Sequence, residues 1–265
     1  MVDAVVLAGR ANTGKLAGVS TAANEALIPI AGKPMLHYVL EALDQAAGVG
    51  RVAVVGPRAL LAPGSGSFGA KVVFVEPAGD VIANLLAGVD ALDPDGMVLA
   101  VTSDIPLLRA RVVDGFLAEC AARPADLHYP FVTRELAEAR FPGMRRTYAC
   151  LRDGMVTGGN LVLFDPAVLR ARAGEARAFY AARKNPLRLA GLLGPTFIIQ
   201  LVLRRLSVAG LEATACRLFG LRAVHAVRTA FPEIVVDVDK PDDYSLVGGF
   251  LGEREGCPAG ASDER

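Results

Sequence analysis

The sequence has no tryptophan, few aromatic residues, three histidines and four widely separated cysteines among its 265 residues. The cysteines form no C-x-x-C pair, which argues against a zinc ribbon or a disulfide framework and favours free thiols in a reducing compartment. His37, His128 and His225 have no partners at metal-ligand spacing, so we expect all three to be structural. These shortages leave carboxylates and Lys or Arg as the candidate functional groups.

An excess of one charge is also lacking, because 28 Lys and Arg balance 28 Asp and Glu. A balanced chain has no long-range field to hold a polyanion, so we expect no nucleic-acid partner. The N-terminus has no basic segment and too short an apolar run for a signal peptide. We therefore predict a cytoplasmic protein.

No hydrophobic run is long enough to span a membrane. The most apolar stretch, Leu187–Leu203, is interrupted by Arg188 and by Gly194–Pro195, and it falls short of the roughly 20 apolar residues that a span needs. A buried or interfacial helix is the expected structure. The sequence leaves open whether this stretch packs on the core, on a second subunit of a homo-oligomer, or against a membrane surface.

Ala, Val, Leu and Gly carry a hydrophobic fraction of 52%. In the first half, short β-branched runs alternate with amphipathic stretches, which is typical of βαβ units and a parallel sheet. We expect strands at 2–7, 51–55, 71–75 and 97–101, and helices beginning at Pro34 and spanning 81–92 and 109–121. Ligands of such sheets bind outside the carboxyl ends of the strands.

The second half of the chain is less regular. Strands are expected at 127–132, 147–151, 161–164, 223–227 and 234–238. Between about 174 and 220 an Arg- and Leu-rich helical insertion is expected, with breaks at Pro186, Gly194–Pro195 and Gly210. We predict one domain over residues 1–252 and a disordered tail over 253–265, where Gly, Pro, Ser and charged residues gather.

A glycine-rich loop, LAGRANTGK from Leu7 to Lys15, directly follows the first expected strand. Glycine lets backbone N–H groups approach a phosphate closely, and a lysine at the end of the loop neutralises it. A plain tight turn explains the glycines equally well. The loop is therefore a candidate phosphate site that needs support from the rest of the chain.

Carboxylates mark two later strand ends. Asp104 follows an apolar strand in TSDIPLL, where it is placed to hold Mg²⁺ against nucleotide phosphates, although an Asp that caps the next turn is the alternative. Asp237 and Asp239 lie in IVVDVDKPDD, where alternate strand residues share a face and two carboxylates repel unless a cation is near. Asp242 and Asp243 fit the first turn of a helix.

At these motifs the sequence resembles a known family. LAG at the end of the first strand, ALIPIAGKPML at 26–36, D-x-P-L at Asp104 and D-x-D-x-P at Asp237 are similar to the MobA-like NTP transferases, which have a GT-A-type Rossmann-like nucleotidyltransferase fold. The resemblance covers most of the chain, and the run at 26–36 is its most specific part. It implies an α/β fold with a mostly parallel central sheet flanked by helices.

The resemblance also implies an activity and a set of site residues. The reaction is transfer of an NMP group from an NTP to a small phosphorylated or anionic acceptor, with release of pyrophosphate and with Mg²⁺ or Mn²⁺ as cofactor. Lys15 and Asp104 are the expected catalytic residues, and Asp104, Asp237 and Asp239 the expected metal ligands. The expected nucleotide contacts are Leu7, Ala8, Gly9, Gly14, Lys15, Lys33, Asn84 and Asp104.

Two of the implied contacts have structural alternatives. The segment TGGN at 157–160 is similar to a family segment that approaches the acceptor, which makes Gly158, Gly159 and Asn160 candidate acceptor-binding residues, but a hairpin turn accounts for them equally well. Asn84 stands where relatives contact base and ribose, and an exposed helical Asn without a role is the alternative.

Two departures from the family pattern bear on catalysis. Arg10 stands where the motif usually has glycine, and Glu25 where many relatives carry a lysine before A-L-x-P. A glutamate there repels a triphosphate unless Lys15 or Lys33 compensates. Two other functions therefore stay open: a catalytically silent nucleotide-binding or regulatory protein on the same fold, and a GT-A glycosyltransferase that uses an NDP-sugar. The latter is disfavoured because Thr102-Ser103-Asp104 lacks the second carboxylate of a D-x-D motif.

Overall fold

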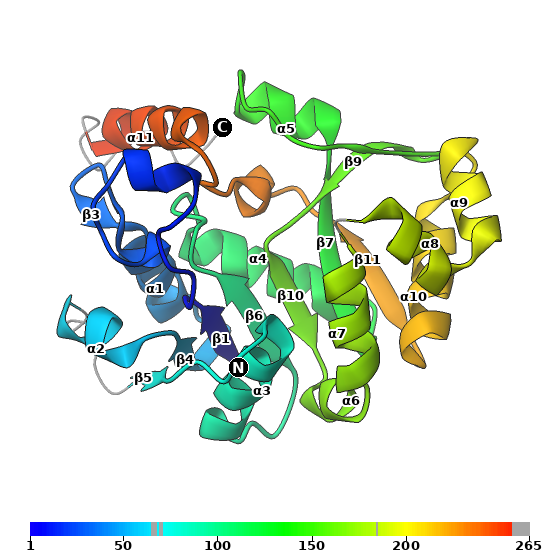
Figure 1. Ribbon diagram of the computed structural model, residues 1–265, viewed down its shortest axis with the longest axis horizontal. Helices are drawn as coiled ribbons and strands as arrows, with labels where there is room; N and C mark the ends of the chain where they lie inside the picture. The colour runs from blue at the N-terminus through cyan, green and yellow to red at the C-terminus, as the bar shows by residue number, and fades with distance from the viewer. Residues whose placement is uncertain (65–67, 69–70, 184, 256–265) are drawn as a thin grey trace.

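The computed structural model describes residues 1–64, 68, 71–183 and 185–255. In this part of the chain a nine-stranded sheet has the order β5-β4-β1-β6-β10-β7-β9-β8, with β11 paired to β7 (Figure 1). The first-half strands β1 (Val2–Leu7), β4 (Val49–Val55), β5 (Val72–Val75) and β6 (Val98–Thr102) are all parallel. Their connections include α1 (Met35–Gln45), α2 (Arg58–Leu61) and α3 (Val81–Leu92).

The second half adds strands of mixed direction. β10 (Leu161–Phe164) lies antiparallel between β6 and β7 (Leu127–Thr133), and β9 (Gly154–Gly158) and β8 (Ala149–Leu151) continue the sheet to its edge. β11 (Val224–Arg228) runs parallel to β7. The helices are α4 (Ala110–Ala121), α5 (Arg134–Arg140), α6 (Pro166–Ala171), α7 (Ala173–Ala182), α8 (Pro186–Leu193), α9 (Pro195–Val202), α10 (Val208–Phe219) and α11 (Pro241–Glu255).

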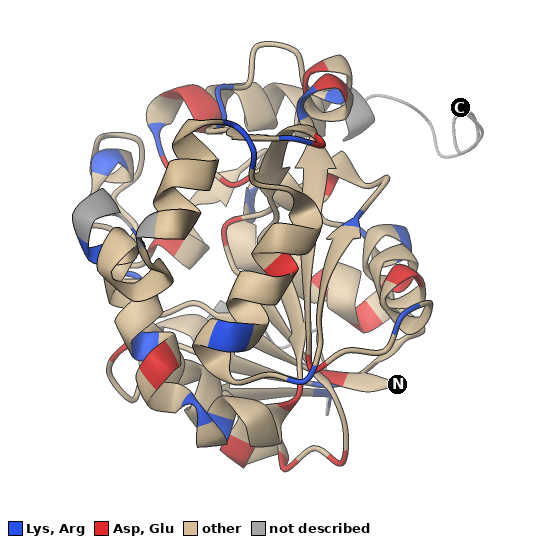
Figure 2. Ribbon diagram, turned by 90° about the vertical axis from the view of Figure 1, so that its right-hand side faces the viewer, with Lys and Arg blue, Asp and Glu red and all other residues tan. Residues whose placement is uncertain are grey.

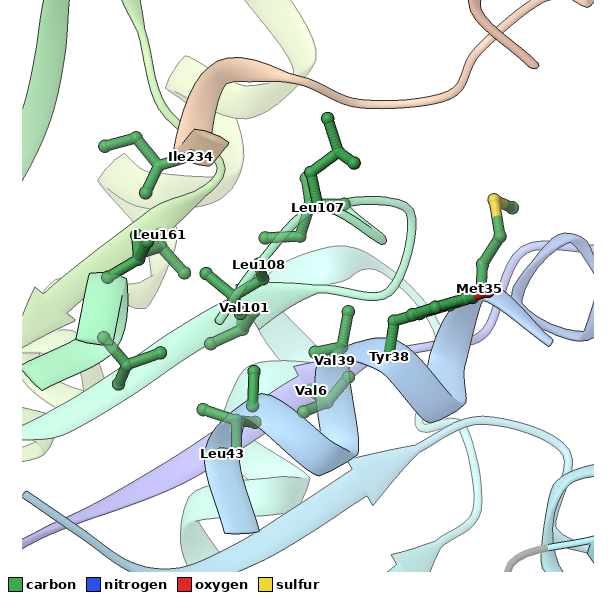
Figure 3. Close-up of a cluster of buried hydrophobic side chains, with 14 of the residues drawn as sticks. Val6, Met35, Tyr38, Val39, Leu43, Val101, Leu107, Leu108, Leu161 and Ile234 are labelled. Carbon is green, nitrogen blue, oxygen red and sulfur yellow. The ribbon is translucent and has the colours of Figure 1, made fainter. Parts of the chain in front are cut away.

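Residues of β1 alternate between two cores, one on each face of the sheet. Ala4 and Val6 face the larger core with α1 and α4, while Val5 faces a smaller core with α3. Helix α1 contributes its i, i+3, i+4, i+7 stripe to the larger core: Leu36, Val39, Leu40 and Leu43. Figure 3 shows Val39 and Leu43 of this helix beside Val6 and Val101 of the sheet. β1 is therefore buried on both faces, as an apolar run in a parallel sheet requires.

Helix α3 approaches the sheet closely because it carries a glycine. A Cβ on Gly88 would lie 2.5 Å from Cγ1 of Val5 and 3.0 Å from Cγ2 of Val55. Its N-terminus is capped by Asp80, whose carboxylate accepts a hydrogen bond of 2.8 Å from the Ala83 amide. The helix lies over β1 and β4, and the loops after β1 and β6 are left open at the carboxyl ends of the strands.

Three expectations about local structure were wrong. Residues 234–238 form no strand: Pro232–Val235 is a 3₁₀ turn (η5), and the following residues are extended without a strand partner. Gly210 does not break a helix, because it lies in the first turn of α10, where the hydroxyl of Ser207 accepts its amide at 3.1 Å. Helix α11 continues through Glu255, past the predicted start of the tail at 253. Residues 256–265 of that predicted tail lie outside the described residues.

The apolar stretch Leu187–Leu203 falls on two short helices, α8 and α9, instead of one. Phe197 and Leu206 are buried against Leu151 of β8 and Val156 of β9. Within the ranges that the structure describes, no helix has both the length and the apolar character needed to cross a bilayer. The helical insertion expected at about 174–220 thus consists of α7 to α10, of which α8 and α9 lie at the β8 edge of the sheet while α10 packs on β11 (Figure 1).

Candidate functional site

The glycine-rich loop after β1 is held in place by hydrogen bonds from the segment that precedes α1. Asn24 donates to the carbonyl of Ala8 at 2.9 Å, and the Glu25 amide donates to the carbonyl of Arg10 at 3.0 Å. Asn12 donates to two carbonyls farther along, those of Ser20 and Ala22. Gly9, Gly14 and Lys15 are left exposed. Residues 8–25 therefore form a closed loop whose glycines and lysine face solvent.

Three carboxylates from distant parts of the sequence meet beside this loop. Asp104 follows β6, and Asp237 and Asp239 follow η5; one oxygen of each lies within 4.8 Å of the others. Asp104 Oδ1 is buried without a hydrogen-bond partner. Burial raises the pKa of Asp104, and the charge of Asp239 raises it further. The three carboxylates therefore lie close together without the strand alternation that the sequence predicted, and metal binding by them stays a prediction.

Backbone hydrogen bonds bring these carboxylates together. The amide of Val238 donates to the carbonyl of Asp104 at 2.9 Å. Asn160 joins the two segments: its amide and side chain both donate to the carbonyl of Ile234, at 2.9 and 3.2 Å, while its carbonyl accepts the Thr102 amide at 3.2 Å. Asn160 therefore fixes the η5 segment against the end of β6.

Close packing in the same region requires glycine at Gly158 and Gly159, which were candidates for acceptor binding. A Cβ on Gly158 would lie 2.2 Å from the Tyr129 hydroxyl, and one on Gly159 would lie 3.0 Å from both Ile234 and Pro130. The segment is not a hairpin turn, because it joins β9 to β10, which are both paired to β7 and not to each other. Glycine is needed here for close approach, and contact with an acceptor stays a prediction.

Arg10 and Glu25, the two departures from the family pattern, form an ion pair. Arg10 Nε lies 3.0 Å from a carboxylate oxygen of Glu25, and another Arg10 nitrogen lies 3.0 Å from Asp239. Glu25 is buried, and burial raises its pKa while the charge of Arg10 lowers it. The arginine side chain is 60% exposed. Arg10 thus connects the glycine-rich loop to the acidic cluster, and the charge of Glu25 has a local counter-ion.

Arg146 is the site residue that the sequence did not reveal. Its guanidinium forms an ion pair with Asp237, its side chain is only 16% exposed, and its Nε is buried without a partner. The pair Arg145–Arg146 resembles ordinary surface charge in the sequence, and Arg145 is indeed exposed. Nothing local distinguishes Arg146, because the loop between α5 and β8 reaches Asp237 only in the folded chain.

Two predicted nucleotide contacts have other partners in the structure. The ammonium of Lys33 lies 2.6 Å from Glu41 and 4.3 Å from the centre of the Tyr38 ring, so no contact with the acidic cluster is seen for this lysine among the described residues. Asn84 lies next to Gly9, 3.7 Å from the position of an added Cβ, but its carbonyl accepts the Ala78 amide at 2.7 Å. Lys33 therefore does not compensate for Glu25 in this arrangement, and Asn84 stabilises the turn before α3.

The histidines lie in packing contacts. His37 meets the ring of Phe68, and His128 meets His225 across β7 and β11, each pair with ring centres 5.5 Å apart. Burial lowers the pKa of all three. The acidic cluster is the only group of potential metal ligands found in the described part of the chain, and it contains no histidine.

Comparison with known proteins identifies the family. A family model described as the MobA-like NTP transferase domain matches residues 4–188. The chain belongs to this family. Membership implies a nucleoside triphosphate substrate and confirms the relationship that the LAG and ALIPIAGKPML motifs indicated.

Solved structures support the fold of the family. A hypothetical transferase from Thermus thermophilus is 40% identical over 92% of this chain and 99% of its own, with a TM-score of 0.78. A CMP:2-keto-3-deoxy-manno-octonic acid synthetase complexed with CTP is 17% identical over 96% and 100%, with a TM-score of 0.60. A 4-diphosphocytidyl-2C-methyl-D-erythritol synthase from Anaerococcus prevotii is 13% identical over 95% and 96%, with a TM-score of 0.58. The last two show the shared fold alone, and the predicted nucleotidyltransferase fold is confirmed.

Proposed function

We propose that this protein transfers an NMP group from an NTP to a small phosphorylated or anionic acceptor and releases pyrophosphate, with Mg²⁺ or Mn²⁺ as cofactor. The observation that carries the proposal is the meeting of Asp104, Asp237 and Asp239 beside the exposed glycine-rich loop. Family membership gives the reaction class, and this arrangement supplies the charges that the reaction needs.

The three carboxylates fit a small hard cation. They offer only oxygen ligands, and the spacing within 4.8 Å is near the ~4.2 Å that separates opposite ligands of Mg²⁺. Asp104 Oδ1, buried and without a partner, has the unsatisfied charge that a cation would balance. A bound cation would offset negative charge on the α-phosphate and on the leaving pyrophosphate.

The residues of the chain bind and orient the two substrates. The backbone amides of the exposed residues Gly9 and Gly14 and the ammonium of Lys15 hold the phosphates, and Arg10 adds a second cation at the acidic cluster. An acceptor oxygen attacks the α-phosphorus as the bond from that phosphorus to the bridging oxygen breaks, and pyrophosphate leaves with the electron pair. No protein nucleophile is needed, so catalysis rests on positioning and charge.

The ion pair of Arg10 and Glu25 bears on the choice between an active enzyme and a silent nucleotide-binding protein. A lone buried glutamate would repel a triphosphate, but Glu25 lies 3.0 Å from the Arg10 guanidinium, which also extends to Asp239. The two departures compensate each other in charge. This compensation supports an active site and removes the main argument for a silent relative.

The test is thermal stabilisation of the full chain by each of the four NTPs, with and without Mg²⁺. A ligand that binds only the folded state raises the melting temperature by mass action. We expect one NTP to do so in a Mg²⁺-dependent manner, and that NTP to yield pyrophosphate with one acceptor from a panel of phosphosugars and phospho-alcohols. No stabilisation by any NTP would overturn the proposal, and stabilisation without pyrophosphate release would favour the silent protein.

A further inference from the structure

Two arginines form ion pairs with carboxylates of the acidic cluster. Arg146 is paired with Asp237, and Arg10 with Asp239, while Asp104 has no cationic partner within hydrogen-bond distance. The two arginines differ in exposure, at 16% for the Arg146 side chain and 60% for that of Arg10. Two of the three predicted metal ligands are therefore already paired with protein cations.

We propose that Arg10 and Arg146 are exchangeable counter-ions: a divalent cation displaces them from Asp239 and Asp237, and they then bind phosphate oxygens of the substrate. This inference rests on the proposed metal-dependent nucleotidyl transfer, and it assigns a binding role to Arg146. A carboxylate oxygen that ligates a cation is no longer available to a guanidinium, and the cation repels the guanidinium at short range.

The displaced arginines need a new anion. A guanidinium stays charged at all physiological pH values, and burial without a partner is costly, which applies most strongly to Arg146 because its Nε already lacks one. A phosphate accepts two parallel N–H bonds from this planar group. Arg10 keeps Glu25 when it leaves Asp239, so it remains beside the glycine-rich loop where the phosphates are expected.

Exchange makes metal and nucleotide binding cooperative. Without nucleotide, the cation must displace Arg10 from Asp239 and must leave Arg146 with no anion to bind, so the affinity for the cation is reduced. With nucleotide present, the displaced guanidinium groups pair with the phosphate oxygens. By linkage, the cation raises nucleotide affinity by the same factor. The site would thus take up the cation together with the NTP.

The experiment is titration with Mn²⁺ alone, followed by calorimetry or electron paramagnetic resonance, and repeated with the stabilising NTP. We expect Arg146→Met to bind Mn²⁺ roughly tenfold more tightly than wild type without nucleotide, and the enhancement by NTP to shrink in proportion. Arg10→Gln should change the Mn²⁺ affinity in the same direction by a smaller factor, because the Arg10 side chain is more exposed. Arg145→Gln is the matched control and should bind Mn²⁺ as wild type does.

Two results separate failure of this inference from failure of the proposed function. Mn²⁺ affinity that is unchanged or weakened in both Arg146→Met and Arg10→Gln would show that the arginines support the carboxylates and do not compete for them. Mn²⁺ binding that is equally weak in wild type and Asp104→Asn, with and without NTP, would overturn the metal site itself and the proposed function with it.

A different observation concerns the surface of α8 and α9. Ile199, Val202 and Leu203 are 57%, 73% and 56% exposed, at helical spacing on one face of α9, and Leu192 of α8 is 37% exposed. The opposite face of α9 packs on the sheet through Phe197 and Leu201. Helix α9 is therefore apolar on both sides, but only one side is covered by the described residues.

The segment of the chain that carries this apolar surface has charged residues of one sign. No Asp or Glu occurs between Glu175 and Glu212, whereas the same segment contains Arg177, Arg183, Lys184, Arg188, Arg204 and Arg205. Arg188, Arg204 and Arg205 are exposed next to the aliphatic residues. Figure 2 faces the side where α8 and α9 lie, and both blue and red segments appear on the helices nearest the viewer. Exposed aliphatic residues bordered by arginines match an anionic lipid surface.

We infer that α8 and α9 dock on an anionic membrane surface. A symmetric contact between two copies fits less well, because a two-fold axis through this surface would bring the arginines of both copies together. Docking here leaves the acidic cluster accessible, since α8 and α9 lie at the β8 edge of the sheet and the cluster lies at the ends of β1 and β6.

The test is co-sedimentation of the full chain with phosphatidylcholine vesicles, with or without phosphatidylglycerol as about a third of the lipid. We expect binding only with phosphatidylglycerol, weakened by salt and reduced roughly tenfold by Arg204→Gln with Arg205→Gln, and similarly by Ile199→Ser with Val202→Ser. Leu60→Ser, an exposed aliphatic residue on α2, is the control and should bind as wild type. Absence of binding to either vesicle, or a dimer in solution that Val202→Ser dissociates, would overturn the inference.

Discussion

Two regions contain groups that lack partners, and these groups differ in kind. They are charged in the acidic cluster at the ends of β1 and β6, and apolar on the surface of α8 and α9. At the cluster, three carboxylates are concentrated: Asp104 lacks a cationic partner at its buried oxygen, and Asp237 and Asp239 are paired with arginines from distant loops. On α9, the unsatisfied groups are exposed aliphatic side chains. Carboxylates and arginines without full pairing favour binding of a small cation or an anionic ligand, whereas exposed aliphatic side chains favour contact with an apolar or membrane surface. The two regions therefore predict different partners.

The largest expected effect is a loss of activity on substitution in the acidic cluster, which substitution on α9 should not cause. Asp104→Asn removes the most buried ligand of the cluster, and we expect turnover to fall by roughly 10³-fold, because the transition-state charge loses its cation. Pyrophosphate release with the acceptor found by screening measures it, under saturating Mg²⁺. Ile199→Ser is the matched control at the other region and should keep wild-type turnover on soluble substrates. Full activity in Asp104→Asn would remove the cluster from the mechanism.

A smaller effect tests whether Glu25 acts through Arg10. We expect Arg10→Gln to weaken binding of the Mg²⁺–NTP complex by about tenfold, the scale of a lost charge-assisted hydrogen bond. Glu25→Gln should lower the NTP affinity less, because it removes an ion-pair partner of Arg10 but keeps the arginine. The double variant should bind NTP no more weakly than Arg10→Gln alone. A double-mutant cycle on NTP affinity measures this coupling. Strictly additive effects would show that the two residues act independently.

Stability should change in the direction opposite to activity at Asp104. Burial raises the pKa of this carboxyl, so the folded state favours its protonated form. The stabilisation that protonation brings is complete below the pKa of the unfolded chain and is lost as pH rises through the folded pKa. Without metal at pH 7, Asp104→Asn should therefore be more stable than wild type by about 1 kcal/mol.

Melting curves of the metal-free proteins across pH measure this difference. The advantage of Asp104→Asn should vanish at acidic pH, where wild-type Asp104 is protonated, and a large excess of Mg²⁺ should reverse it at pH 7. The same melting profile for wild type and Asp104→Asn at every pH would mean that the buried charge costs no folding free energy.

The smallest expected effect concerns α9. Val202→Ser and Ile199→Ser should each change the free energy of unfolding by less than about 0.5 kcal/mol, because these side chains are exposed in the folded chain. Phe197→Ala, on the packed side of the same helix, should cost about 3 kcal/mol. Urea denaturation measures both. A marked loss of stability in Val202→Ser would show that this face is covered in solution.

The parallel half of the fold could be predicted from sequence because its signals are local. The expected helix at 81–92 matches α3, and the expected strand at 2–7 matches β1, since the local pattern of apolar residues suffices to define them. The expected strand at 234–238 was wrong. Its apolar residues are buried as a 3₁₀ turn and an extended segment that the backbone of Asp104 and Asn160 holds in place.

The sequence by itself determined the family, the α/β fold and which three carboxylates are the candidate metal ligands. Strand ends, glycines and acidic motifs are each recognisable within a few consecutive residues. Tertiary structure alone decided which charges meet. Arg10 and Glu25 appear in the sequence as two separate departures, and they are one ion pair in the fold. Arg146 appears as surface charge, and it lies buried against Asp237. Pairing of charges 91 residues apart depends on how loops pack, which no local pattern encodes.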